Sequence, residues 1–216
     1  MTTATMGTLT PTEAAVVACV SVRDVNRTVD EKILPEDLYA IGTDRTRRFY
    51  IDACTFIAFY FKAADRLTSE ERLRTITQAS AHLRKYFKNG RVKEWIVSDD
   101  FLRIDLAPFL KGVHERLAKL EKARALVVED PQILDGTPVI EGTRIPVYDI
   151  ASSVEAGVPV ERILGAYPGL SAERISLAAL YAQANPLRGR PPRSPSPPRG
   201  AIIVSSRRIP RRKQAS

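Results

Sequence analysis

The chain has 216 residues, 44% of them hydrophobic, which is enough for one large or two small domains with real cores. Its net charge of +8 arises at one end, because residues 187–216 hold nine of the 33 basic residues and no acid, which leaves 24 basic against 25 acidic residues elsewhere. Cys19 and Cys54 lack metal-ligand spacing and no apolar run reaches the roughly 20 residues of a membrane span, so we expect a soluble, cytoplasmic protein with both cysteines in its core.

The first elements form a helix-turn-helix pattern. Thr10-Pro11 predicts the start of a helix that runs through Cys19, and Ser21 caps a second helix that we expect to end at about Ile33. The link at Val20 is too short for anything but a sharp corner. These two helices therefore have the spacing of a helix-turn-helix.

A wing follows the helix pair. Residues 38–41 and 47–50 are predicted strands around a turn at 42–44, and an apolar, aromatic-rich helix over residues 51–62 closes the core beneath them. Together these elements predict a winged helix-turn-helix domain over residues 1–66, which resembles the MerR-like DNA-binding domain.

Two sets of polar side chains in this domain suit DNA. Positions 23, 26 and 27 share one helical face, where a recognition helix meets base edges, and arginines of a wing suit phosphate contacts. The candidate DNA-binding residues are therefore Arg23, Asn26, Arg27, Arg45, Arg47 and Arg48. The alternative is a solvated helix face beside a basic hairpin. Because residues 1–50 hold six basic and seven acidic side chains, we expect a dimer to strengthen binding.

Residues 67–125 are predicted to connect two domains. Thr68 starts a capped helix through Phe87, two strands over residues 93–97 and 102–106 flank a turn, and a further helix spans about Ala107 to Ala123. Leucines at helical spacing on this last helix predict core packing, with a dimer seam as the alternative.

Residues 126–186 form a distinct, mainly helical domain that opens on an extended segment. The segment 130–147, DPQILDGTPVIEGTRIPV, has glycine turns on either side of a short apolar run, which predicts strand, turn, strand, turn, strand. Three helices follow, over 147–156, 160–166 and 171–185, with tight corners between them. We therefore expect a three-helix, helix-turn-helix-like bundle.

This segment resembles the small domain known as domain of unknown function 433, which recurs in VapB-type antitoxins, the partners of PIN-domain ribonuclease toxins. The matching positions are Asp130, Pro131, Ile133, Gly136, Thr137, Pro138, Val139, Gly142, Thr143, Arg144, Ile145, Pro146, Val147, Gly157, Ile163, Leu164, Tyr167, Pro168 and Leu170. The match runs roughly from Leu126 to Asn185.

The charge of this domain distinguishes it from a DNA-binding bundle. Residues 127–187 hold three arginines against eight acids, and an acidic surface repels phosphate. The domain is better suited to dimerisation or to contact with another protein. We expect Arg144 to pin its turn by pairing with an acid rather than to bind a ligand.

Residues 187–216 are predicted to be a disordered, Pro/Arg-rich basic tail that contains one strand-like apolar run. In VapB-type antitoxins, a C-terminal segment commonly crosses the carboxylate-rich metal site of the toxin, where arginine can displace the metal. The resemblance therefore implies toxin-binding residues Ile202, Ile203, Val204, Arg207, Arg208, Arg211 and Arg212. An unstructured, solubilising end is the alternative.

Catalysis is not expected, because the chain offers no nucleophile with a base, carboxylate pair, metal cluster or phosphate loop at recognisable spacing. We expect no cofactor and no metal. The leading hypothesis is an antitoxin of a type II toxin–antitoxin system that represses its own operon by binding DNA, neutralises a PIN-domain ribonuclease, and forms a homodimer or a higher assembly with its toxin. The alternative is a stand-alone transcription regulator whose C-terminal domain binds a protein or a ligand.

Overall fold

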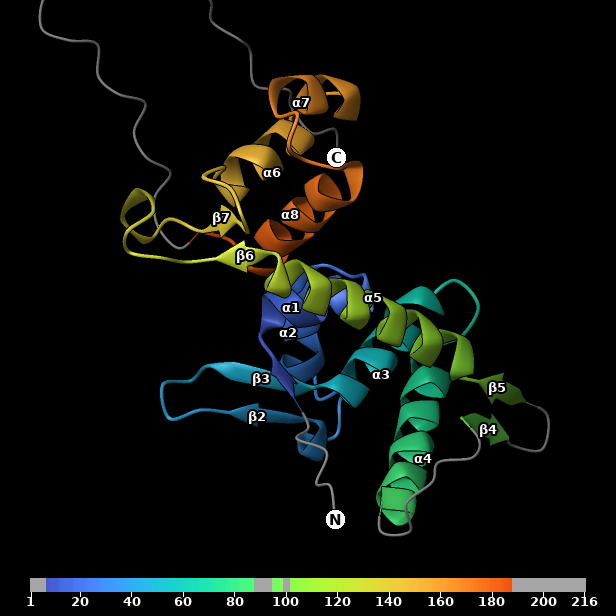
Figure 1. The fold of residues 1–216 in the computed structure, drawn as a ribbon. Helices are drawn as coiled ribbons and strands as arrows, with labels where there is room; N and C mark the ends of the chain where they lie inside the picture. Colours follow the sequence, from blue (N-terminus) through green and yellow to red (C-terminus); the bar gives the residue numbers. More distant parts are fainter. Residues whose placement is uncertain (1–6, 88–94, 99–101, 188–216) are drawn as a thin grey trace, which may run out of the picture. The chain divides into compact units, whose positions relative to one another are not determined.

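The computed structural model describes residues 7–87, 95–98 and 102–187 (Figure 1). The described residues up to Pro186 belong to one compact unit. The described part contains eight α-helices and three small antiparallel sheets, which confirms the predicted mainly α fold with small β elements. None of the described helices is long and apolar enough to cross a bilayer. The sequence-based domain boundaries stay a prediction.

The first two helices begin at the predicted capping residues. Helix α1 (Pro11–Ala18) has a capping box, in which the hydroxyl of Thr10 accepts the N–H of Glu13 and the Glu13 carboxylate accepts the N–H of Thr10 at 2.8 Å. Helix α2 (Val22–Asp30) starts where the Ser21 hydroxyl accepts a backbone N–H at 3.0 Å. The two predicted consecutive helices are therefore present.

Each helix is followed, within two residues of its end, by a left-handed residue that is not glycine. Cys19 (φ 58°) makes the corner between α1 and α2, and it is exposed, so its predicted place in the core was wrong. Lys32 (φ 53°) stops α2 at Asp30, earlier than the predicted end near Ile33. The reason is a Schellman-type reversal, in which the N–H of Ile33 donates to the Thr28 carbonyl at 2.9 Å.

The wing belongs to a three-stranded antiparallel sheet in the order β1-β3-β2. Strands β2 (Tyr39–Ile41) and β3 (Arg47–Tyr50) confirm the predicted hairpin, and the short β1 (Thr8–Leu9) pairs with the other edge of β3. A 3₁₀ turn (Glu36–Leu38) leads into β2. Helix α3 (Ile51–Lys62) follows β3 directly and has the predicted bounds.

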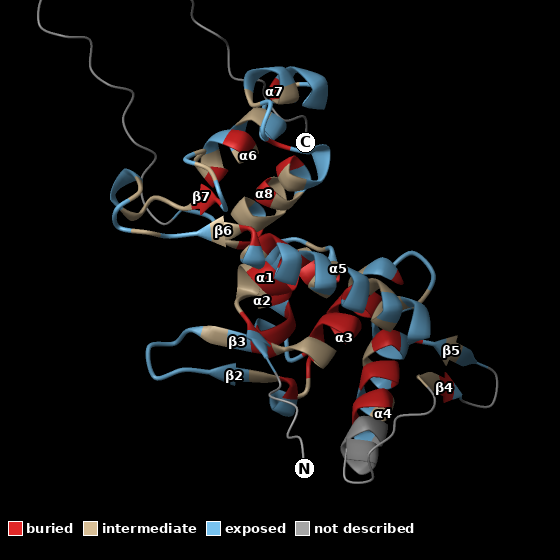
Figure 2. Ribbon diagram, in the orientation of Figure 1, coloured by how far each residue is buried: buried red, intermediate tan, exposed pale blue. Residues whose placement is uncertain are grey.

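Helix α1 is the buried centre of this first core (Figure 2). Its inward positions include Ala14, Ala15 and Ala18, whose small side chains let neighbouring helices approach closely. It packs against α2, α3 and two helices from later in the chain, α5 (Ala107–Ala125) and α8 (Ala172–Ala184). One short helix therefore contacts helices from the N-terminal, middle and C-terminal parts of the described chain.

The middle of the chain forms a helix, a hairpin and a second long helix. Helix α4 (Ser69–Phe87) and α5 (Ala107–Ala125) match the predicted helices closely, and β4 (Ile96–Ser98) pairs antiparallel with β5 (Arg103–Asp105) as the predicted hairpin. The buried Arg72 of α4 donates to the Tyr60 carbonyl at 2.5 Å, and its guanidinium lies 4.3 Å from that ring centroid. The Arg72 guanidinium thus provides a hydrogen-bond donor for a backbone carbonyl near the C-terminal end of α3.

The C-terminal part builds a second apolar core. Strand β6 (Val127–Val128) pairs antiparallel with β7 (Val139–Ile140), so the first predicted strand lies earlier than expected and the third is reduced to a single bridge between Val139 and Pro146. A 3₁₀ turn (Leu134–Gly136) separates β6 from β7. The three predicted helices are present as α6 (Val147–Glu155), α7 (Val160–Ala166) and α8 (Ala172–Ala184).

An ion pair joins α1 to α5. Glu13 Oε1 accepts from Arg124 Nη2 at 2.6 Å, and Arg124 Nη1 also donates to Glu121 at 2.5 Å. Burial alone raises the pKa of Glu13, but hydrogen bonds from Arg124 and Thr10 outweigh it and lower the pKa below its ordinary value. Arg116 Nε adds a second link, because it donates to the Val17 carbonyl of α1 at 2.5 Å.

Two fully buried threonines allow a matched test of hydrogen bonding in the first core. The Thr28 hydroxyl donates to the Val25 carbonyl at 2.7 Å, whereas the Thr55 hydroxyl has no hydrogen-bond partner in the described part of the chain. We expect Thr55→Val to raise the free energy of unfolding by about 1 kcal/mol and Thr28→Val to lower it by about the same amount. Urea unfolding of both variants checks this, and equal losses would contradict it.

The Glu13–Arg124 pair predicts a pH-dependent stability. Because the pKa of Glu13 is lower in the folded than in the unfolded chain, its contribution is present above the unfolded pKa and is lost as the pH falls through the folded pKa. We expect Arg124→Met to lower the free energy of unfolding by about 1–2 kcal/mol near pH 7 and by less at about pH 3.5. Lys119→Met, an exposed change on the same helix, is the control; an equal loss for Arg124→Met at both pH values would contradict the assignment.

Candidate nucleic-acid interface

The outer face of α2 carries three of the predicted DNA-binding residues in three different environments. Arg23 is exposed and makes no hydrogen bond or ion pair with any residue that the structure describes. Arg27 pairs with Glu31 one turn later at 2.7 Å, which raises its pKa, and its guanidinium lies 6.0 Å from the centroid of the Phe61 ring. Asn26 is only half-exposed, and its amide donates to the carbonyl of Val22.

Arg47 fastens the wing to α2. Its Nη1 donates to the backbone carbonyl and to Oδ1 of Asn26, both at 3.1 Å, and its Nη2 lies 2.6 Å from Asp30 Oδ1. The hydrogen bond from Arg47 lowers the pKa of Asp30. Asn26, predicted to contact a base, and Arg47, predicted to contact a phosphate, are therefore hydrogen-bonded to each other. The structure brings these two residues together to hold the wing against α2.

Arg47 and Arg48 lie on opposite faces of the sheet, because successive strand residues alternate. Arg47 shares a face with the buried Phe49, whereas Arg48 is exposed and lies near enough to Asp44 to contribute to lowering its pKa. The alternation of side chains along a strand is the signal in the sequence that could have predicted opposite faces for these two arginines. The wing arginines are therefore not equivalent.

A tight turn at the wing tip presents Arg45. The N–H of Arg45 donates to the Gly42 carbonyl at 2.9 Å, and Arg45 has a left-handed backbone (φ 61°). Asp44 Oδ1 accepts from both the N–H and the hydroxyl of Thr46, which lowers the pKa of Asp44. The exposed side chain of Arg45 makes no hydrogen bond or ion pair within the described residues.

The acids of α2 and of its C-cap residue are engaged within the protein. Asp24 accepts from the capping hydroxyl of Ser21 at 2.7 Å, Asp30 pairs with the wing, and Glu31 pairs with Arg27. Their internal partners reduce the repulsion that a nearby phosphate would meet. The surface thus presents Arg23 and Arg45 as unpaired cations, one on the helix and one at the wing tip.

No group of three or more His, Cys, Asp or Glu side chains in the described ranges is placed to hold a metal ion. Cys54 lies in the core as predicted, and burial raises the pKa of its thiol to about 12, so it is unreactive near neutral pH.

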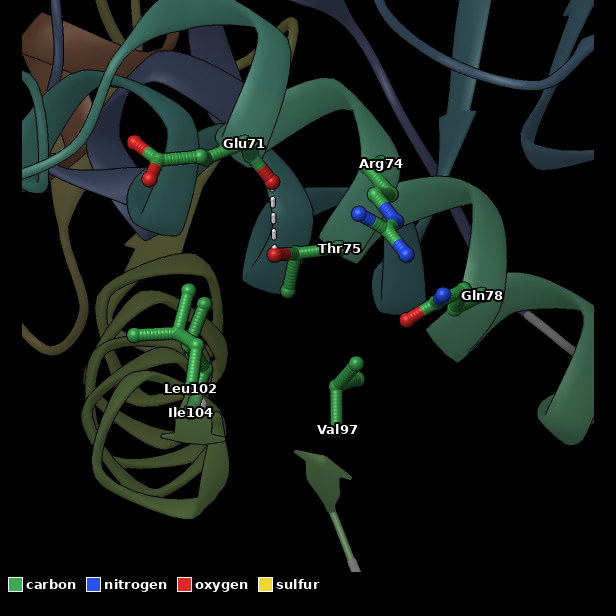
Figure 3. A pocket seen from close by; sticks show the side chains of 7 residues that line it. All are labelled: Glu71, Arg74, Thr75, Gln78, Val97, Leu102 and Ile104. Atoms are coloured by element: carbon green, nitrogen blue, oxygen red, sulfur yellow. Dashed lines mark hydrogen bonds between the residues drawn. The ribbon is translucent and has the colours of Figure 1, made fainter. Parts of the chain in front are cut away.

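A half-enclosed cavity of about 200 Å³ lies between α4 and the β4–β5 hairpin (Figure 3). Its polar wall comes from α4 and its apolar wall from the hairpin. The lining residues are Glu71, Arg74, Thr75, Gln78, Val97, Leu102 and Ile104. Thr75 uses its hydroxyl within α4, donating to the Glu71 carbonyl at 2.7 Å. Sequence reasoning missed this cavity, although positions 71, 74, 75 and 78 have the spacing of one helical face.

Two further sequence expectations concern the C-terminal half. Arg144 is exposed and forms no ion pair with any described residue, so the prediction that it pins its turn by pairing with an acid was wrong; backbone and Thr143 hydrogen bonds hold the turn instead. The remaining candidates lie outside the described residues. They are the predicted toxin-binding residues Ile202, Ile203, Val204, Arg207, Arg208, Arg211 and Arg212.

The described elements define a mainly α protein with small β elements, in which two short helices and a three-stranded sheet come first and a hairpin with three helices comes last. Residues 127–182 match the family model described as "Protein of unknown function (DUF433)". The whole chain is 51% identical over 210 residues to "Uncharacterized protein y4eO" of Sinorhizobium fredii (strain NBRC 101917 / NGR234), an alignment that spans 95% of this chain and 94% of that protein. The chain therefore belongs to the same family as y4eO and contains a DUF433 domain.

Among solved structures, the chain is similar to the X-ray crystal structure of Rv2018 from Mycobacterium tuberculosis. The sequence identity is 16% and the TM-score is 0.33, with 78% of this chain and 95% of that chain covered.

Proposed function

We propose that this protein is a non-enzymatic transcription repressor that binds DNA through its winged helix-turn-helix. The observation that supports this most directly is the attachment of the wing to α2 by Arg47, which makes the helix and the hairpin one surface. A recognition helix in the major groove with an adjacent wing on the flanking backbone requires such a fixed arrangement.

The proposed contacts divide between bases and phosphates. Arg23, near the start of α2, is the residue proposed to read a base, because an unpaired guanidinium can donate two bonds to guanine. Arg45 at the wing tip is proposed to contact a phosphate, with Arg48 in a lesser role on the other face of the sheet. Asn26 and Arg47 are proposed to act by holding the wing.

Arg23 and Arg45 give separable predictions for DNA binding. On a duplex taken from upstream of this protein's own gene, we expect Arg23→Ala to weaken binding by about tenfold or more and to relax base preference. We expect Arg45→Ala to weaken binding to all sequences and to reduce the salt dependence of the affinity by about one phosphate contact. Fluorescence anisotropy across a salt series measures both effects.

Lys119→Ala is the matched control, because it removes one exposed positive charge from α5. A scrambled duplex of equal length controls for non-specific binding. Unchanged affinity of Arg23→Ala for the upstream duplex would reject α2 as the recognition helix.

We further propose a more specific role as an antitoxin that neutralises a PIN-domain ribonuclease. The resemblance of the segment 130–147 to VapB-type antitoxins and the DUF433 match support it. The basic tail after Leu187 is the proposed inhibitory segment, because arginines complement the carboxylates of a PIN-domain site. A stand-alone repressor is the alternative if no such toxin is encoded beside this gene.

Removal of the tail tests this role. We expect the product of the neighbouring gene to copurify with the full chain and to lose its ribonuclease activity in the complex. A chain that ends at Leu187 is expected to bind the upstream duplex but to leave the ribonuclease active. Full inhibition by the shortened chain would exclude the tail, and a neighbouring product without ribonuclease activity would favour the stand-alone repressor.

A further inference from the structure

The turn that follows β7 presents an unpaired arginine beside an open apolar depression of about 480 Å³. We call this surface the Arg144 face. Its lining residues are Val128, Ile133, Val139, Gly142, Thr143 and Arg144. Val139 is buried at the floor, whereas Val128 is 37% exposed at the rim. The face thus combines a cation with accessible apolar side chains.

The turn that carries Arg144 is tightly bonded. The N–H and the hydroxyl of Thr143 both donate to the Ile140 carbonyl, at 3.0 and 2.7 Å, and the hydroxyl accepts the N–H of Ile145 at 3.1 Å. Gly142 supplies the left-handed residue that this turn requires (φ 72°). The backbone that carries Arg144 is therefore fixed by hydrogen bonds, whereas its side chain pairs with nothing in the described part of the chain.

A left-handed segment beside this face exposes a leucine. Leu134, Asp135 and Gly136 have consecutive positive φ angles of 47°, 54° and 81°, an unfavourable conformation for the first two residues. Leu134 is 49% exposed in this conformation. Strained backbone that displays an apolar side chain to solvent is typical of a surface that contacts a partner.

The charges around the Arg144 face are complementary to one another. Asp135 and Glu141 are exposed, lie next in the chain to residues of the face or of its strained rim, and form no side-chain hydrogen bond or ion pair with any described residue. The exposed residues that form and flank the Arg144 face thus include both an unpaired cation and unpaired acids. A two-fold interface needs both signs of charge on the same patch, because a residue of one copy meets a different residue of that patch on the other copy.

We infer that the Arg144 face is where two copies of this chain associate, with Arg144 of each copy paired to Asp135 or Glu141 of the other. Leu134 and Val128 would be buried at the contact. Strand β6 adds to this surface, because it is an edge strand that pairs only with β7 among the described strands. This inference goes beyond the DNA-binding proposal and does not depend on it.

Sedimentation velocity of the full chain without DNA tests the inference over a range of concentrations. We expect the wild-type chain to form a species of twice its 24.0 kDa mass. Arg144→Glu, which places like charges across the two-fold axis, is expected to weaken the dimer by at least about tenfold. Glu141→Arg or Asp135→Arg is expected to do the same, and one of them combined with Arg144→Glu should restore the dimer.

Arg162→Glu is the matched control, since it reverses one exposed arginine on α7 outside this face. Circular dichroism establishes that each variant folds. A wild-type chain that stays monomeric, an Arg144→Glu chain that dimerises as strongly as the wild type, or the failure of both double variants to recover the dimer would each overturn the inference.

Discussion

One carboxylate, that of Glu13, has two roles on which the rest of the described structure depends. Its Oε2 accepts the N–H of Thr10 and so starts α1, while its Oε1 accepts the Arg124 guanidinium and so fixes α5 against α1. Only 9% of the Glu13 side chain is exposed, so loss of Arg124 would leave a nearly buried charge without its main partner. The same interaction therefore defines both where the first helix begins and what packs on it.

Three consequences follow from the central position of α1. Its alanines allow α3, α5 and α8 to pack closely, so the helix-turn-helix and the DUF433 domain share a supporting helix. Ala184, at the end of α8, belongs to the first apolar core although the rest of that helix packs in the second. The outer face of α2 keeps Arg23 and Arg27 exposed, and Arg47 holds the wing beside it.

Local chemistry made much of the fold predictable from sequence. Thr10, Ser21 and Ser171 begin helices because their hydroxyls accept backbone N–H groups, and the residue pattern 51–62 gave the bounds of α3. The sequence-based predictions that were wrong depend on contacts between residues far apart in the chain or on unusual backbone conformations. The ends at Cys19 and Lys32 required left-handed backbone in residues other than glycine, and the contact between Arg47 and Asn26 joins residues 21 positions apart. Whether Arg144 forms an ion pair likewise depends on its neighbours in space, and the spacing of residues along the sequence does not identify them.

The central claim is that α1 couples the two apolar cores, and urea unfolding with one probe in each core tests it most directly. Trp95, the only tryptophan of the chain, packs on Phe56 at 6.1 Å between ring centroids and reports on the first core. Amide exchange at Ile175 and Ala178 of α8 reports on the second. We expect both probes to give one urea midpoint and Glu13→Gln to lower both by the same amount. A second core that keeps its wild-type midpoint in Glu13→Gln would contradict the claim.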